Sequence, residues 1–225
     1  MQLNPFQIST VSPSGFEVAI ECFGVQSNNQ WQIVATGTGA SWVNSNITSA
    51  SEAGVITGAT GSTATGFVNI GSASFSTIAL TNGLVTWKSK LKLNQLSTAV
   101  ETFVCRNGIL KSLSGVPNDG VFFRYTDSVN SGRWEAVCRI GGVETAVNTG
   151  ILGDLNYHKF DIQVNNNATS VKFLIDNSIV NTITTNIPTS ATFLGFGSSL
   201  IKSVGVTSVS YSSDYYTLNK VILNR

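Results

Sequence analysis

Charged side chains are scarce in this sequence. They make up 11% of its 225 residues, and 13 lysines and arginines are nearly balanced by 12 aspartates and glutamates. An average domain carries roughly 25% charged residues. Without clustered cations, the chain lacks the electrostatic footprint of a nucleic-acid-binding protein and the polybasic patch of a membrane-surface protein. We therefore expect neither a nucleic acid nor a membrane among its partners.

Histidine, cysteine and long apolar runs are also scarce. The single histidine, His158, excludes metal sites built from several histidines. The three cysteines (Cys22, Cys105 and Cys138) are far apart and form no CxxC pair, which favours buried free thiols over a disulfide or a metal site. No apolar run reaches the about 18 residues of a membrane span, and the first residues do not resemble a signal peptide. These features predict synthesis in a reducing cytoplasm.

What the sequence has instead is alternation of apolar and polar residues, the pattern of half-buried strands. In residues 86–93, Trp87, Leu91 and Leu93 alternate with three lysines. Turn-forming Asn, Asp and Gly residues separate such runs. The predicted strands are 16–23, 30–35, 86–93, 121–125, 133–140, 158–164, 171–175, 179–184, 204–211 and 215–223. This spacing predicts a single all-β domain over residues 1–225, an antiparallel β-sandwich or jelly roll.

Two segments depart from the alternating pattern. Residues 36–77 are rich in Gly, Ala, Ser and Thr, and Glu52 is their only charge. Two interpretations stay open for them: short, loosely patterned strands with long loops, or a segment that orders against a neighbouring subunit. Residues 1–15 are a candidate N-terminal arm.

Several short motifs follow one another between residues 84 and 222. They are LSTAVETF (96–103), DGVFFRY (119–125), RWEAVCR (133–139), NYHKFDI (156–162), VKFLIDN (171–177), NIP (186–188), LIKS (200–203) and SDY (213–215). In this order they resemble concanavalin A-like, laminin-G-type sandwich domains, especially those of bacteriophage virion proteins. The family usually has Trp where Tyr157 stands and Gly where Asn177 stands.

The resemblance implies a virion structural protein, either a capsid decoration or cement protein or a tail component. Its partners would then be other virion proteins and copies of itself, with a trimer as the expected oligomer by analogy. The alternative is a lectin-like carbohydrate-binding module that adsorbs to glycans of a host surface. The sequence leaves both open, and the expected location is the virion.

No catalytic set is evident in the sequence. A glycosidase needs two carboxylates about 5–10 Å apart, and the Glu-x-Asp-x-x-Glu pattern of the related glucanases is absent. Glu135 and Glu144 could approach each other across a hairpin, but nothing in the sequence fixes that geometry. His158 shares a strand face with apolar residues, which predicts a core-edge position. We therefore expect no catalytic residues and no enzyme.

The resemblance to laminin-G-type domains implies one possible ion, calcium. Loop carboxylates such as Asp119, Asp127 and Asp154 could hold it. Turn formation by Asp side chains is the commoner role, so we expect no cofactor and no metal site, with calcium as the lesser alternative.

The candidate binding residues are few. Trp42 is the candidate aromatic platform for a glycan, with Arg124 and Arg139 as candidate polar groups. Trp87 and Trp134 lie on apolar strand faces and are expected in the core. Lys88, Lys90 and Lys92 form a stripe on one strand face. This stripe is either a solvated face that discourages edge pairing or an interface with an acidic neighbour.

Overall fold

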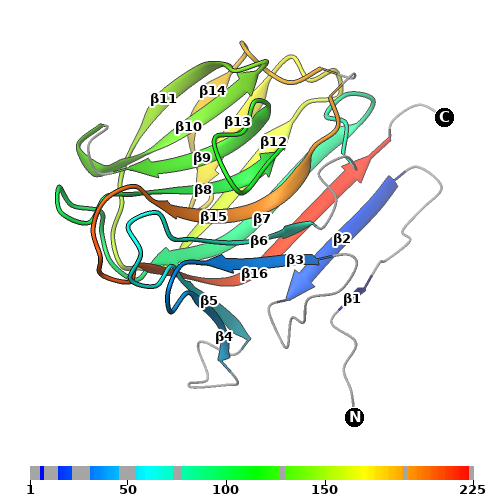
Figure 1. The fold of residues 1–225 in the computed structure, drawn as a ribbon. Coiled ribbons are helices and arrows are strands. Elements are labelled where there is room, and N and C mark those ends of the chain that lie inside the picture. Colours follow the sequence, from blue (N-terminus) through cyan, green and yellow to red (C-terminus); the bar gives the residue numbers. More distant parts are fainter. Residues whose placement is uncertain are drawn as a thin grey trace.

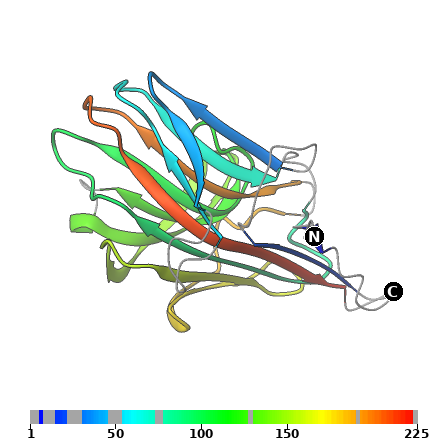
Figure 2. The ribbon, with the colours of Figure 1, turned by 90° about the horizontal axis from the view of Figure 1, so that it is seen from below.

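The computed structural model describes residues 6–7, 15–21, 31–45, 54–72, 78–126, 130–189 and 192–222. Within these ranges the chain forms strands and one short 3₁₀ turn, η1 (Asn130–Gly132). The strands pair into two antiparallel sheets, which stack as the two layers of a sandwich (Figures 1 and 2). No helix of the described part has the length and apolarity needed to cross a membrane.

The first sheet, sheet A, contains both early and late parts of the chain. In spatial order its strands are β1 (Phe6–Gln7), β2 (Gly15–Glu21), β16 (Ser210–Val221), β7 (Leu84–Leu93), β12 (His158–Val164), β13 (Val171–Ile175) and β14 (Ser178–Ile183). Beside this path, β4 (Ser41–Ser45) pairs with β5 (Val55–Ala59), and β5 pairs with β16.

The second sheet, sheet B, has seven strands and carries the candidate site. In spatial order they are β11 (Val143–Leu152), β10 (Arg133–Ile140), β9 (Gly120–Thr126), β8 (Phe103–Leu110), β15 (Gly195–Lys202), β6 (Phe67–Ser72) and β3 (Trp31–Thr36). Figure 1 follows these strands from β11 at one edge to β3 at the other.

The core lies between the two sheets and is built by the predicted alternation. Trp87 of sheet A and Trp134 of sheet B are both fully buried there. The Phe160 ring lies edge-on to Trp134 with centroids 4.8 Å apart and tilted to Phe123 with centroids 5.0 Å apart, within the usual range for aromatic pairs. The apolar faces of the sequence pattern therefore meet each other, as a sandwich requires.

A polar network crosses this core. Asn107 on β8 donates to the Ser89 hydroxyl on β7 over 2.8 Å. Ser198 on β15 donates to the side-chain oxygen of Asn107, and the Tyr216 hydroxyl on β16 lies 2.9 Å from the Ser198 hydroxyl. All four side chains are buried, so the network ties the two sheets together in one register.

Most predicted strands are present, but several segments differ from the prediction. The expected strands 204–211 and 215–223 are one strand, β16, which is irregular between Ser213 and Tyr215. Residues 204–209 form no strand, since their backbone turns back on Glu101, whose carboxylate accepts hydrogen bonds from the Val206 and Thr207 amides. Strands β8, β11 and β15 were not predicted.

The Gly/Ser/Thr-rich region 36–77 is more ordered within this chain than the sequence pattern indicates. Its described residues include β4, β5 and β6, and β6 lies between β3 and β15 in sheet B. Residues 46–53 and 73–77 lie outside the described residues, as does most of the candidate arm 1–15.

The cysteines of the described part are free and buried. They are Cys105 and Cys138, as predicted, and Cys22 lies outside the described residues. Burial raises the pKa of Cys105 to about 12, and it also raises the pKa of Cys138. Both thiols therefore behave as small apolar side chains.

Candidate functional site

One line of polar side chains runs across five adjacent strands on the outer face of sheet B. Its members are paired in register from strand to strand: Asn69 (β6), Ser199 (β15), Arg106 (β8), Arg124 (β9) and Glu135 (β10). Directly paired residues of antiparallel strands project to the same side of the sheet. Their chain neighbours, among them Val68, Leu200, Cys105, Phe123 and Trp134, face the core. We call these five residues the polar row.

The polar row is recessed although it faces away from the core. The exposed fractions are 2% for Asn69, 0% for Ser199, 7% for Arg106 and 4% for Glu135. The neighbouring part of the face is covered by the segment 111–119, which connects β8 to β9. Its Leu113 is buried in a separate apolar cluster with Leu110, Phe122 and Val137.

Glycines allow this cover to sit close to the sheet. Beside the polar row, Gly71 (β6), Gly197 (β15) and Gly108 (β8) are paired in register. A Cβ on Gly71 would lie 2.4 Å from Leu113 Cδ1, which is closer than such atoms can approach. The cluster around Leu113 therefore forms one wall beside the row.

Arg124 joins two carboxylates at the β9–β11 end of the site. Its Nε donates to Glu135 Oε2 over 2.7 Å, and its Nη1 donates to Glu144 Oε1 over 3.0 Å. Arg139 Nη1 donates to Glu144 Oε2 over 2.6 Å, and Asn130 donates to the other oxygen of Glu135. The two glutamates thus fix Arg124 and Arg139 in a charged network.

The network alters the ionisation of Glu144. Burial of this carboxyl opposes its ionisation, but the charge of Arg124 and the hydrogen bonds from Arg139 and Arg124 outweigh it, and the pKa of Glu144 is lowered. Glu144 is therefore an ion-pair partner at neutral pH and holds no proton to donate.

Four buried polar atoms on this face have no hydrogen-bond partner. Among the described residues they are Asn69 Oδ1, Ser199 Oγ, Arg106 Nε and Arg139 Nε. Burying a polar group without a partner is costly, so natural structures keep few such atoms. Three of the four belong to the polar row: the amide oxygen of Asn69, the hydroxyl of Ser199 and a guanidinium nitrogen of Arg106, which come from adjacent strands.

Two of the three candidate glycan residues lie together. Arg124 and Arg139 share Glu144, whereas Trp42 belongs to β4 at the other end of the molecule. Trp42 Nε1 donates to the Val34 carbonyl of β3 over 2.8 Å, and β3 is four strands from β9 in sheet B, about 19 Å at the usual strand spacing.

The Trp42 ring is also engaged in packing. It lies edge-on to Tyr211 with ring centroids 5.6 Å apart, and it covers Gly58, where a Cβ would collide with it. Trp42 thus contributes to the packing of β4 and β5 on the core, and it takes no part in the polar row.

The lysine stripe lies on sheet A and has partners within the chain. Lys90 pairs with Asp214 at 2.7 Å, and the longer Lys88–Asp161 contact is 3.8 Å. Lys92 Nζ lies 4.7 Å from the centroid of the Tyr157 ring, a cation–π contact. The stripe is therefore partly neutralised by its own chain.

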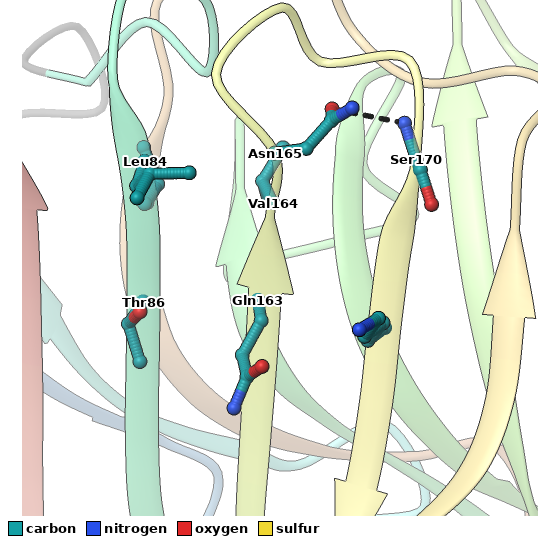
Figure 3. A pocket seen from close by; sticks show the side chains of 8 residues that line it. Leu84, Thr86, Gln163, Val164, Asn165 and Ser170 are labelled. Carbon is teal, nitrogen blue, oxygen red and sulfur yellow. Dashed lines mark hydrogen bonds between the residues drawn. The ribbon is translucent and has the colours of Figure 1, made fainter. Parts of the chain in front are cut away.

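A hollow lies on the outer face of sheet A. Figure 3 shows the residues that line it, over the ends of β7 and β12. Its volume is about 220 Å³. Asn165 accepts a hydrogen bond from the Ser170 amide and so is used to shape the turn. Ligand pockets usually measure about 300–1,000 Å³, and no described residue lining this hollow has a buried unpartnered polar atom.

His158 lies at the core edge with both ring nitrogens engaged. Its Nδ1 lies 2.6 Å from Asp176 Oδ2 and its Nε2 lies 3.0 Å from Asp154 Oδ1. Asp154 and Asp119 also accept backbone hydrogen bonds in turns, from Asn156 and Gly141. Asp127 lies outside the described residues, and no group of carboxylates, histidines or cysteines in the described part is arranged to hold a metal ion.

The sequence analysis did not find Asn69, Ser199 or Arg106. Each is an ordinary polar residue in a strand, and only the pairing of β6, β15 and β8 places them side by side. One feature of the sequence did point to this face of the sheet: Arg124 has an outward position on a strand with few other charges.

No protein-family profile matches this sequence, and no curated protein matches it. Solved structures do match in fold. A protein of unknown function from Shewanella oneidensis MR-1 has a TM-score of 0.66 and 13% identity over 97% of this chain and 92% of that one. The carbohydrate recognition domain of Emp47p has a TM-score of 0.59 and 12% identity, over 90% and 94%. A Bacillus licheniformis beta-glucanase has a TM-score of 0.57 and 16% identity, over 96% and 100%.

These matches correct one prediction made from the sequence. A beta-glucanase shares this fold, so the expectation that the protein is no enzyme is contradicted. The structure also supplies a geometry that the sequence did not fix, because Arg124 holds Glu135 and Glu144 in place relative to each other. Both carboxylates contact one guanidinium group at 2.7 and 3.0 Å. They are therefore closer than the about 9.5 Å that inverting glycosidases tolerate.

The predicted fold class is confirmed. The chain is an all-β protein with two antiparallel sheets, a sandwich of the concanavalin A-like jelly-roll kind that includes carbohydrate-recognition and glucanase domains.

Proposed function

We propose that the protein binds a carbohydrate on the outer face of sheet B, through the polar row. The observation that carries the proposal is the set of buried, unpartnered atoms on that face: Asn69 Oδ1, Ser199 Oγ and Arg106 Nε. Sugar hydroxyls both donate and accept, so one ring can satisfy acceptors and donors placed side by side. The carbohydrate recognition domain and the glucanase of the same fold support this choice of ligand class.

Affinity electrophoresis through gels that contain a soluble polysaccharide tests the proposal. The gels should include a β-glucan, a mannan, a xylan and a polyuronate, and we expect retardation in at least one. The double variant Asn69→Ala/Ser199→Ala should migrate freely, and the control Thr86→Ala/Gln163→Ala, in the hollow of sheet A, should be retarded like the wild type. Free migration in every gel would overturn the proposal, as would loss of binding in the control alone.

Glycoside hydrolysis is a second candidate, and the placement of Glu135 and Glu144 around Arg124 favours it. In that role Glu144, which is ionised at neutral pH, would act as the nucleophile or base, and Glu135 would have to donate the proton to the leaving oxygen. The test is release of reducing ends from the same polysaccharides. Glu135→Gln and Glu144→Gln should each abolish it, and activity that survives both substitutions would exclude this pair.

A role in virion assembly is a separate proposal, which rests on the resemblance of residues 84–222 to virion sandwich domains. In that role the lysine stripe and the N-terminal segment would contact neighbouring subunits. Light scattering coupled to size exclusion tests it. We expect a trimer that persists on dilution, and a monomer at every concentration would contradict self-assembly.

A further inference from the structure

The charges around the polar row do not balance. Three arginines and two glutamates gather there, which leaves one positive charge in excess. Glu135 pairs with Arg124, and Glu144 pairs with Arg124 and Arg139. Arg106 has no carboxylate partner among the described residues, so the excess charge belongs to Arg106.

Burying the charge of Arg106 without a carboxylate partner costs free energy. The residue is 7% exposed, and its Nε has no acceptor among the described residues. Its register partner on the next strand is another cation, Arg124. Desolvation by burial, followed by repulsion from Arg124, lowers its pKa to about 10. At neutral pH the guanidinium therefore keeps its proton, and loss of charge cannot relieve the cost of burial.

We propose that the carbohydrate carries a carboxylate, as a uronic or sialic acid does, and that Arg106 binds this group. The inference rests on the proposed carbohydrate-binding function and names the ligand class. A guanidinium presents a planar fork of donors that matches a carboxylate, so the incoming anion supplies the missing countercharge. A neutral sugar would cover Arg106 and leave its charge uncompensated.

The neighbours of Arg106 favour one orientation of an acidic sugar along the polar row. Asn69 Oδ1 is an acceptor only, so it repels a carboxylate and accepts from a sugar hydroxyl. Ser199, which lies between Asn69 and Arg106 in the register, can donate to either group. The row therefore orients the saccharide with its carboxylate at β8 and its hydroxyls toward β6.

A glycan array that displays neutral, carboxylated and sulfated glycans tests the inference on the full-length protein. Arg106→Gln removes the charge, and Arg106→Lys keeps the charge but loses the fork. The matched control is Lys172→Gln, which removes one positive charge from the hollow of sheet A. Thermal denaturation of every variant establishes that it is folded before it is applied to the array.

We expect the wild type and Lys172→Gln to bind carboxylated glycans. Arg106→Gln should weaken that binding by about tenfold or more, the usual worth of a charged hydrogen bond. Arg106→Lys should weaken it less. Binding to neutral or sulfated glycans in preference to carboxylated ones would overturn the inference and leave the proposed function standing. Equal binding of carboxylated glycans by Arg106→Gln and the wild type would also overturn the inference and leave the proposed function standing. Binding to no glycan of any kind would overturn both.

Discussion

Two adjacent serines on β15 should respond in opposite ways to the same substitution. Ser198 and Ser199 are both fully buried, but they face opposite sides of sheet B. The Ser198 hydroxyl donates to Asn107 and contacts the Tyr216 hydroxyl in the core network. Ser199 Oγ faces the polar row and has no partner among the described residues.

The magnitudes follow from these contacts. Ser198→Ala leaves the Asn107 side-chain oxygen buried without its donor, which costs about 1–3 kcal/mol of unfolding free energy. Ser199→Ala removes a buried group that is already unsatisfied, so the unfolding free energy should stay the same or rise by about 1 kcal/mol. The two variants should therefore differ by about 1–4 kcal/mol, with Ser199→Ala the more stable.

Urea denaturation at neutral pH, followed by tryptophan fluorescence, measures the difference. Equal m-values would show that the two variants unfold from comparable native states. The reasoning is refuted if Ser199→Ala destabilises the protein as much as Ser198→Ala does. That result would mean that Ser199 already has a partner in the free protein and is not held ready for a ligand.

Three further outcomes follow from the structure. Because the pKa of Glu144 lies below its ordinary 4.5, its ionised form contributes stability that is complete above that value and is lost as the pH falls through the lowered pKa. The urea stabilities of wild type and Glu144→Gln should thus converge on acidification, and parallel curves would contradict this. Cys105 and Cys138 should not react with a soluble maleimide at about pH 8 until the protein is unfolded, because both thiols are buried. Mass mapping measures the labelling, and labelling of either cysteine in the native protein would contradict this. Asn177→Gly should raise stability by about 0.5 kcal/mol, because both residues of the Asp176–Asn177 turn have positive φ and glycine adopts it without strain; a lower melting temperature would argue against this.

The sequence analysis predicted the sheet-forming segments well where alternation is strong. Residues 133–140, 158–164 and 171–175 form β10, β12 and β13 with those bounds. Strand β15 was missed because Gly195, Gly197, Ser198 and Ser199 give it little contrast between its two faces. Its burial comes from its neighbours β6 and β8, which are distant in the sequence.

The candidate site could be predicted only in part for the same reason. Arg124 and Arg139 stand out because they face outward on neighbouring strands of one hairpin-rich region. Arg106, Ser199 and Asn69 come from three strands spread over 130 residues, and only the long-range register brings them together. Trp42 was selected for its polar surroundings in the sequence, yet its ring is used to cover Gly58 and contact Tyr211.

The position of a bound oligosaccharide is the most direct test of the central claim. A crystal of the protein soaked with the oligosaccharide that binds in solution should show a sugar ring against Asn69, Ser199 and Arg106 on the outer face of sheet B. A sugar that occupies the hollow of sheet A beside Gln163, with the polar row left untouched, would contradict the claim.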